Sequence, residues 1–304
     1  MTHISAPGKL MIAGEWAVLE PGNPCIVTAV NKRVHAETEK NDKFIIELKD
    51  FNLKTEGFIK NSKIEWNSND KKFSFAKASI ETTLKFLNIS ETFALTTYGS
   101  SYIEIADKKL GFGTSAAATV AIISSILKHF NVDIAENKDL VYKLASISNY
   151  IAQGKVGSGF DIASSIYGGI ITYERFDPCW LENELSTKEI KEIITQEWPG
   201  LKIEPLKTPK NLFLLVGFSN ESASTTEMIE TMEIFKQNDN ENYTRIYNNI
   251  SSLIQELIGA WKNDEQDIIL QLIRKNEELL RELSEFSKIV IETDNLKILS
   301  TAAN

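Results

Sequence analysis

Three short segments contain glycines together with residues that could act on a phosphate group. The middle segment, residues 109–118, has the sequence Lys-Leu-Gly-Phe-Gly-Thr-Ser-Ala-Ala-Ala and continues into an apolar stretch. Gly111 and Gly113 allow close backbone approach, and Thr114 and Ser115 are typical of a helix start. A helix N-terminus after glycines presents free N–H groups to a phosphate, and a hydroxyl there can bind magnesium. An ordinary cap in front of a buried helix would have the same composition, so this segment alone leaves both interpretations open.

Neither of two widespread phosphate-binding motifs accounts for the middle segment. The P-loop pattern, Gly-x-x-x-x-Gly-Lys-Ser/Thr, occurs nowhere in the chain. The dinucleotide pattern Gly-x-Gly-x-x-Gly/Ala is matched by Gly111, Gly113 and Ala116. That pattern should follow a buried strand, whereas residues 107–109 are Asp-Lys-Lys. The other two segments must therefore decide its meaning.

Each of those two segments combines glycine with one charged residue. Residues 6–9, Ala-Pro-Gly-Lys, precede an apolar run that could deliver Lys9 into a cleft, although a surface lysine after a turn has the same pattern. Residues 154–163, Gly-Lys-Val-Gly-Ser-Gly-Phe-Asp-Ile-Ala, end at a predicted helix start. A carboxylate at that position would stay ionised, so Asp161 could act as a base or an orienting group. A helix-start aspartate without chemistry is the alternative.

Composition limits the class of protein. The chain has 304 residues, with 42% hydrophobic and 25% charged residues, as expected for a globular protein of one large or two ordinary domains. A net charge of −9 gives no support for a nucleic-acid or anionic-membrane partner. No apolar run is long enough to span a bilayer, and the N-terminus has no signal-peptide pattern. Two cysteines, Cys25 and Cys179, are too few for a disulfide framework or metal cluster, so we expect a cytoplasmic protein.

Hydrophobic periodicity predicts the elements that must position the three segments. Strands are expected over 26–36, 44–53, 93–97 and 169–175, and helices over 75–87, 116–130 and 140–151. After a proline-rich connection with a charged helix over 186–196, the pattern predicts a strand over 211–219 and helices over 241–262, 265–286 and 296–303.

The three segments in this order resemble the GHMP kinase superfamily, and within it the phosphomevalonate kinase branch. The likeness covers essentially the whole chain. It is carried by residues 6–18, 111–117, 153–163, 166–169 (Ile-Tyr-Gly-Gly), 198–201 (Trp-Pro-Gly-Leu) and 222–224 (Ser-Ala-Ser). Mevalonate kinases usually have a magnesium-binding glutamate where this chain has Tyr150, which favours the phosphomevalonate branch. The middle motif departs from the usual Gly-Leu-Gly-Ser-Ser at Phe112 and Thr114, but keeps a hydroxyl at each place that needs one.

The resemblance implies an α+β, two-domain GHMP kinase fold. An N-terminal domain like domain 2 of ribosomal protein S5 would bind ATP within residues 1–180, and a ferredoxin-like domain would follow within 181–304. The family's third glycine motif is expected beyond residue 304. We therefore expect a chain truncated in its C-terminal domain, with an exposed apolar surface and an unpaired strand edge there. Such an edge could pair with a second copy, so a homodimer is possible.

The resemblance also implies a reaction, the transfer of the ATP γ-phosphoryl group to the phosphate of 5-phosphomevalonate with Mg²⁺. Lys9 and Asp161 would be catalytic. Because the acceptor phosphate is already ionised, Asp161 would orient Lys9 and the acceptor more than remove a proton. The residues expected to hold ATP phosphates are Lys109, Gly111, Gly113, Thr114, Ser115 and Ala116, with Ser115 also on the metal. Those expected to bind the acceptor are Gly157, Ser158, Ser222, Ser224 and Arg274.

Two alternatives remain open at the level of the sequence. A mevalonate kinase or a diphosphomevalonate decarboxylase would share the ATP site and differ in the acceptor. A non-catalytic homologue would bind small anions or a protein partner without turnover, which the expected absence of the third motif makes plausible.

Overall fold

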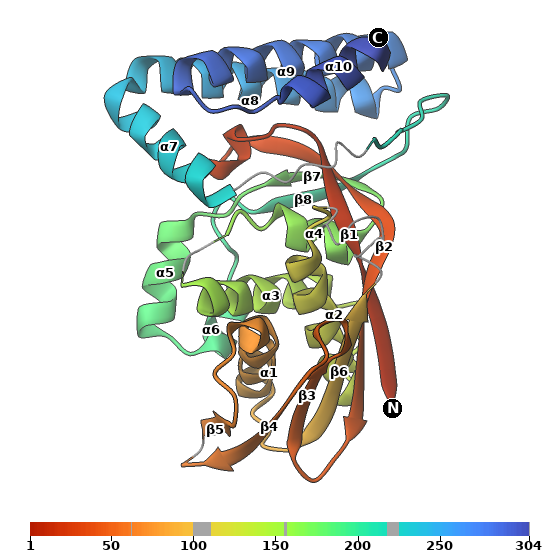
Figure 1. Cartoon of the computed structure of the whole chain (residues 1–304), viewed down its shortest axis with the longest axis vertical. Helices are drawn as coiled ribbons and strands as arrows, with labels where there is room; N and C mark the ends of the chain where they lie inside the picture. The colour runs from red at the N-terminus through yellow and green to blue at the C-terminus, as the bar shows by residue number, and fades with distance from the viewer. Residues whose placement is uncertain (62, 100–110, 155–156, 218–224, 304) are drawn as a thin grey trace.

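A computed structural model describes residues 1–61, 63–99, 111–154, 157–217 and 225–303. Its centre is a mixed sheet of eight strands (Figure 1). Seven of them follow the order β5 (Lys63–Trp66), β4 (Leu53–Lys60), β3 (Phe44–Leu48), β6 (Phe93–Gly99), β2 (Pro24–Lys40), β7 (Ile170–Glu174) and β8 (Lys202–Leu206). The eighth, β1 (Thr2–Ala13), pairs with β2.

The long strand β2 joins the two halves of the sheet. One of its edges pairs with β1 from Thr2 to Ala13, with a register shift between Pro7 and Gly8. Its other edge pairs with β6 near one end and with β7 near the other. Strand β1, which contains Lys9, and strand β7, which follows the helix of Asp161, therefore both pair with β2.

Four predicted helices are present and pack on one face of the sheet (Figure 1). They are α1 (Ser74–Leu87), α2 (Thr114–His129), α3 (Lys138–Gln153) and α4 (Phe160–Tyr167). In β3 the side chains of Phe44, Ile46 and Leu48 are buried, and those between them are more exposed, as expected for a strand with one covered face. Gly154, in a left-handed conformation with φ +71°, ends α3 where the sequence predicted it.

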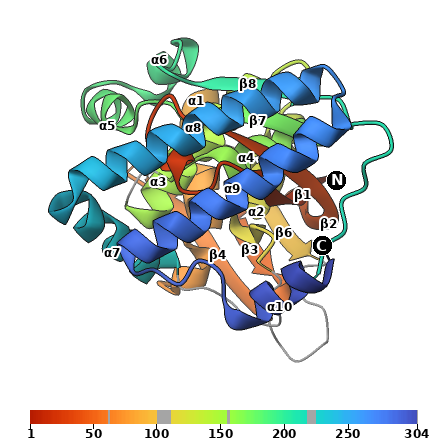
Figure 2. The same ribbon diagram turned by 90° about the horizontal axis from the view of Figure 1, so that it is seen from above.

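A second layer consists of α7 (Thr225–Asn238), α8 (Asn240–Lys262), α9 (Gln266–Ser287) and α10 (Asp294–Ala303). Figure 2 shows α8 and α9 side by side across the β1–β2 end of the sheet. The predicted apolar stripes bring them there, because their buried residues form a separate core with Ala13, Ala17, Ile26 and Leu206. In the described part of the chain, no helix combines the length and apolar character needed to span a bilayer.

The connection after the first domain differs from its prediction. The helix expected over 186–196 is two helices, α5 (Pro178–Thr187) and α6 (Ile190–Thr195). Leu181, Ile193 and Trp198 pack into the core beneath the sheet, and β8 extends that sheet by pairing with β7. The N-terminal core therefore runs past the boundary predicted at residue 180.

The strand predicted over 211–219 is wrong for the described residues of that stretch. Residues 212–217 have no regular structure, and Phe213 and Leu215 are 88% and 91% exposed. A strand requires a neighbour that accepts its hydrogen bonds, and no described strand pairs with these residues. From residue 207 onward the described elements are all helices, so the sheet of a ferredoxin-like domain is not among them. The exposed apolar surface expected in this half is present here.

Candidate active site

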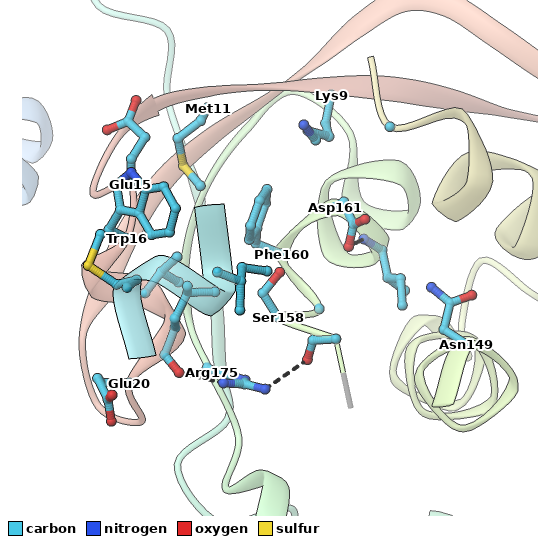
Figure 3. Close-up of a pocket in the computed structure, with 18 of the residues that line it drawn as sticks. Lys9, Met11, Glu15, Trp16, Glu20, Asn149, Ser158, Phe160, Asp161 and Arg175 are labelled. Carbon is cyan, nitrogen blue, oxygen red and sulfur yellow. Dashed lines mark hydrogen bonds between the residues drawn. The ribbon is translucent and has the colours of Figure 1, made fainter. Parts of the chain in front are cut away.

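A cavity of about 830 Å³ lies between the sheet, helices α3 and α4, and the layer of α7 and α8. Figure 3 shows the side chains that surround it. The cavity brings together residues from all three glycine segments. The predicted site residues that line it are Lys9, Gly111, Gly113, Gly157, Ser158 and Asp161.

The first and middle segments interlock. The Lys9 amide donates a 2.9 Å hydrogen bond to the Phe112 carbonyl. A β-carbon on Gly8 would lie 2.6 Å from that carbonyl oxygen, and one on Gly113 would lie 3.0 Å from Lys9 Cε. Close approach to a backbone oxygen thus requires glycine at position 8, whereas at Gly113 the φ of +69° favours glycine and the lysine side chain could move aside. The lysine side chain passes over Gly113, and Nζ lies 5.5 Å from the centre of the Phe160 ring.

Asp161 lies in the first turn of α4, two residues after Gly159, which is the N-cap. Its Oδ1 accepts a 2.9 Å hydrogen bond from the Ile162 amide. Burial raises the pKa of Asp161, and the charge of Lys9 and the backbone N–H groups only partly oppose this. The helix terminus favours the ionised form, as predicted, but desolvation is the larger effect. The site therefore holds a carboxylate whose charge costs free energy until a charged or polar partner arrives.

The N-terminus of α2 keeps its polar groups available. Gly113 is the N-cap and has no side chain to cap with. The Thr114 and Ser115 hydroxyls make no hydrogen bond within the described chain, so the cap interpretation does not account for them. Neither residue lines the cavity itself, Ser115 is exposed, and Ala116 is buried in the core. Of the five residues expected to hold ATP phosphates that the structure describes, only Gly111 and Gly113 line the cavity.

The donor set fits Mg²⁺ carried by a nucleotide. Mg²⁺ takes oxygen ligands and is commonly bound through substrate phosphates plus one or two side chains. The hydroxyls of Thr114 and Ser115, which have no hydrogen bond to any other described residue, could supply such oxygens. Within the described ranges, no three His, Cys, Asp or Glu side chains are grouped to hold a metal by themselves. The protein would therefore contribute few ligands, with the phosphates contributing the others.

Two cavity residues were missed by sequence reasoning. Glu15, in the first segment, is half-buried and accepts a 3.2 Å hydrogen bond from Asn276 Nδ2, and desolvation raises its pKa. Its position after Gly14 in the conspicuous run 6–18 was an available signal. Asn149 lines the cavity from α3, and its Oδ1 lies 2.9 Å from Thr119 Oγ1. Nothing in the local pattern around Asn149 distinguishes it from a polar helix residue.

Helices α7 and α8 form the far wall of the cavity, and Glu20 joins them to the first segment of the chain. Its Oε1 accepts hydrogen bonds from Lys236 Nζ at 2.5 Å and Tyr243 Oη at 2.7 Å. Burial raises the pKa of Glu20, but these two donors outweigh it, so the pKa lies below its ordinary value. The contacts hold α7 and α8 against the turn after β1, which places Met232 in the cavity wall.

The positions of the four remaining predicted site residues either are not described or lie away from the cavity. Lys109, Ser222 and Ser224 lie outside the described residues. Arg274 is exposed on α9 and does not line the cavity. Its helix turns Leu272 and Asn276 inward, four residues apart, and a residue midway between them points to the opposite side. The structure therefore places Arg274 away from the cavity that Lys9 and Asp161 line, and its predicted role in acceptor binding stays a prediction.

Comparisons with known proteins identify relatives of this chain. The model of the GHMP kinases N terminal domain matches residues 79–169. A phosphomevalonate kinase of Streptomyces sp. (strain CL190) is 25% identical over 312 residues, which cover 98% of this chain and 83% of that protein.

Two solved structures have the same fold over nearly the whole chain. The Lin0012 protein from Listeria innocua is 30% identical with a TM-score of 0.90, covering 99% of this chain and 84% of the other. The Streptococcus pneumoniae phosphomevalonate kinase, solved with phosphomevalonate and AMPPNP, has a TM-score of 0.80 at 24% identity, covering 94% and 81%. The chain described here belongs to the GHMP kinase superfamily.

Proposed function

We propose that the protein is a phosphomevalonate kinase, which transfers the γ-phosphoryl group of ATP to the phosphate of 5-phosphomevalonate and releases 5-diphosphomevalonate and ADP. The observation that carries this proposal is the convergence of Lys9, Gly113 and Asp161 on one cavity. The phosphomevalonate kinases among its relatives support the choice of acceptor.

Positioning and charge stabilisation account for most of the catalysis of phosphoryl transfer. The N–H groups at the start of α2 would bind the nucleotide phosphates, with Thr114 or Ser115 on Mg²⁺. When bound, Mg²⁺ would neutralise part of the charge on the transferred group. Lys9 would offset the repulsion between the donor and acceptor phosphates as they approach.

Asp161 would act chiefly as an orienting group. The acceptor oxygen belongs to a phosphate that is largely ionised near pH 7, so there is little need for a base. The half-buried carboxylate lies close enough to Lys9 for the lysine charge to lower its pKa. Asp161 would thus hold the Lys9 ammonium group in the cavity while the acceptor binds.

The test is a parallel assay of ADP release with mevalonate, 5-phosphomevalonate and 5-diphosphomevalonate as acceptors. We expect turnover with 5-phosphomevalonate alone, and loss of turnover when Mg²⁺ is chelated. Phosphorylation of mevalonate, or CO₂ release from the diphosphate, would identify one of the sibling activities instead. Nucleotide binding without transfer to any of the three would identify a non-catalytic homologue. Light scattering of the same sample tests the possible homodimer.

A further inference from the structure

Two side chains from the end of β7 hold consecutive carbonyls of the segment that precedes Asp161. Tyr173 Oη donates a 2.7 Å hydrogen bond to the Ser158 carbonyl. Arg175 Nη2 donates a 3.2 Å hydrogen bond to the Gly157 carbonyl, drawn as a dashed line in Figure 3. Tyr173 is within the strand and Arg175 is the first residue after it, so one short stretch of chain sets both contacts.

The Tyr173 hydroxyl is itself held in one direction. It lies 2.8 Å from Tyr142 Oη, and both side chains are fully buried. A carbonyl can only accept, so the single proton of Tyr173 goes to Ser158, and Tyr142 must donate to Tyr173. Burial raises the pKa of both tyrosines well above the usual value, so both keep their protons at neutral pH. The order Tyr142, Tyr173, Ser158 is therefore a chain of hydrogen bonds with a fixed direction.

Gly159 shows how closely the segment lies on this hydroxyl pair. A β-carbon at this position would be 2.6 Å from Tyr142 Oη and 2.6 Å from Tyr173 Oη. Its φ of +82° is also in the region that favours glycine. The Gly159 backbone thus packs directly against the two tyrosine oxygens, and Asp161 follows two residues later.

The same sheet also positions Lys9. Tyr173 pairs with Cys25 on β2, and Lys9 pairs with Ala29 on the same strand. Arg175 in addition donates a hydrogen bond to the Leu19 carbonyl, in the turn that leads to Glu20. Strands β2 and β7 therefore fix the positions of three features relative to one another. These are Lys9, the glycine segment before Asp161, and the turn that leads to Glu20.

We propose that Tyr173 and Arg175 are positioning residues that set the place of Asp161 relative to Lys9. The expected effects on kcat and KM rest on the proposed function, whereas the structural part of the inference does not. It predicts that loss of either contact affects the acceptor side of the reaction, because the nucleotide side is built from the separate segment at 111–115.

The chain offers a matched pair of variants for the test. Tyr173→Phe and Tyr142→Phe each remove one buried hydroxyl from the same pair, but only the first removes a hydrogen bond to the segment. Tyr173→Phe should lower kcat by about tenfold and leave the KM for ATP within about twofold. Tyr142→Phe should keep kcat within about threefold, since the bond to Ser158 remains.

A second measurement needs no substrate. Hydrogen exchange of the amides in residues 157–163 of the full-length, unliganded protein should be faster in Tyr173→Phe than in Tyr142→Phe at equal temperature. Arg175→Met should lower kcat and speed this exchange as Tyr173→Phe does. Arg175→Lys should restore part of the lost kcat, because lysine can still donate a hydrogen bond to the Gly157 carbonyl. If Tyr173→Phe does not fold, the two Arg175 variants provide the same comparison.

Equal kinetic losses and equal exchange in the two tyrosine variants would overturn the proposal, because both hydroxyls would then serve packing alone. If unaltered protein fails to phosphorylate 5-phosphomevalonate, the proposed function fails. The exchange comparison still decides in that case whether β7 positions the segment.

Discussion

The two glycine segments that face the cavity differ in how firmly the protein holds them. The segment at 111–115 is tied to Lys9 at Phe112 and Gly113, while a β-carbon on Gly111 would meet nothing within 4 Å. The segment at 157–161 accepts hydrogen bonds from the side chains of Tyr173 on β7 and of Arg175 just after it, and a β-carbon on Gly159 would lie 2.6 Å from two tyrosine oxygens. If the function proposed above holds, the difference teaches that the segment proposed to bind the nucleotide leaves polar groups for its ligand to complete, whereas the segment proposed to bind the acceptor is pre-organised.

Replacing Lys9 should have the largest effect, because it touches one segment and electrostatically affects the other. Lys9→Ala should lower kcat by about 10²-fold or more, since the charge between two phosphates is lost. The melting temperature should change little. Steady-state kinetics and a thermal melt on the same sample measure both.

Lys138→Ala is the matched control for Lys9→Ala. Its Nζ lies 5.4 Å from the centre of the Tyr167 ring, a contact similar to that of Lys9, but the residue does not line the cavity. This variant should keep near-normal kcat. Near-normal kcat in Lys9→Ala as well would remove Lys9 from the mechanism.

Alanine at the two glycines tests the difference in packing directly. Gly111→Ala should cost only the strain of a left-handed backbone, about 1 kcal/mol. Gly159→Ala meets two tyrosine oxygens as well and should cost a further ~1–3 kcal/mol. Urea unfolding of both variants gives the comparison. Equal costs would mean that the 157–161 segment can move away from the tyrosines and is not rigidly held.

Asp161→Asn should affect turnover more than nucleotide binding. We expect kcat to fall by about tenfold, with ATP affinity nearly unchanged, because the nucleotide is held by the other segment. Titration with a non-hydrolysable ATP analogue measures the affinity. If ATP binding collapses while bound substrate still turns over, Asp161 belongs to the nucleotide side.

The same variant tests the pKa shift of Asp161. Its pKa is raised in the folded protein, so the folded state binds the proton more tightly than the unfolded state does. This penalises folding above the folded pKa and disappears below the unfolded pKa. Asp161→Asn should therefore raise the free energy of unfolding at pH 7 but not at strongly acid pH. A variant less stable than the unaltered protein at pH 7 would contradict this sign.

The hydroxyls at the α2 start should give the smallest effect. Ser115→Ala should weaken Mg·ATP binding by roughly two- to fivefold, because Mg²⁺ can replace a lost side-chain oxygen with water. Thr114→Ala is the companion variant that shows which hydroxyl matters. Calorimetry at several Mg²⁺ concentrations measures both. No effect from either would leave this segment as a helix start without a metal role.

Local patterns in the sequence determined much of the fold and pointed to Lys9 and Asp161, which both line the cavity. The apolar stripe of α8 (Asn240–Lys262) and the glycine that ends α3 at Gly154 are properties of a few consecutive residues, so they could be predicted. Lys9 and Asp161 were found in the same way, from glycines whose need for close approach or positive φ is visible in the sequence. The order of the three segments was enough to indicate the family.

Only the tertiary structure decided which distant residues support that site. Glu20 and Lys236 are 216 positions apart, and Tyr142 and Tyr173 are 31 apart, so no local pattern connects them. Asn276 rather than Arg274 faces inward because the packing of α9 fixes its rotation. Residues 212–217 have strong strand propensity, yet a strand exists only where another strand pairs with it. Strand and helix propensity depend on a few consecutive residues, whereas strand pairing and burial depend on contacts between segments that are distant in the sequence.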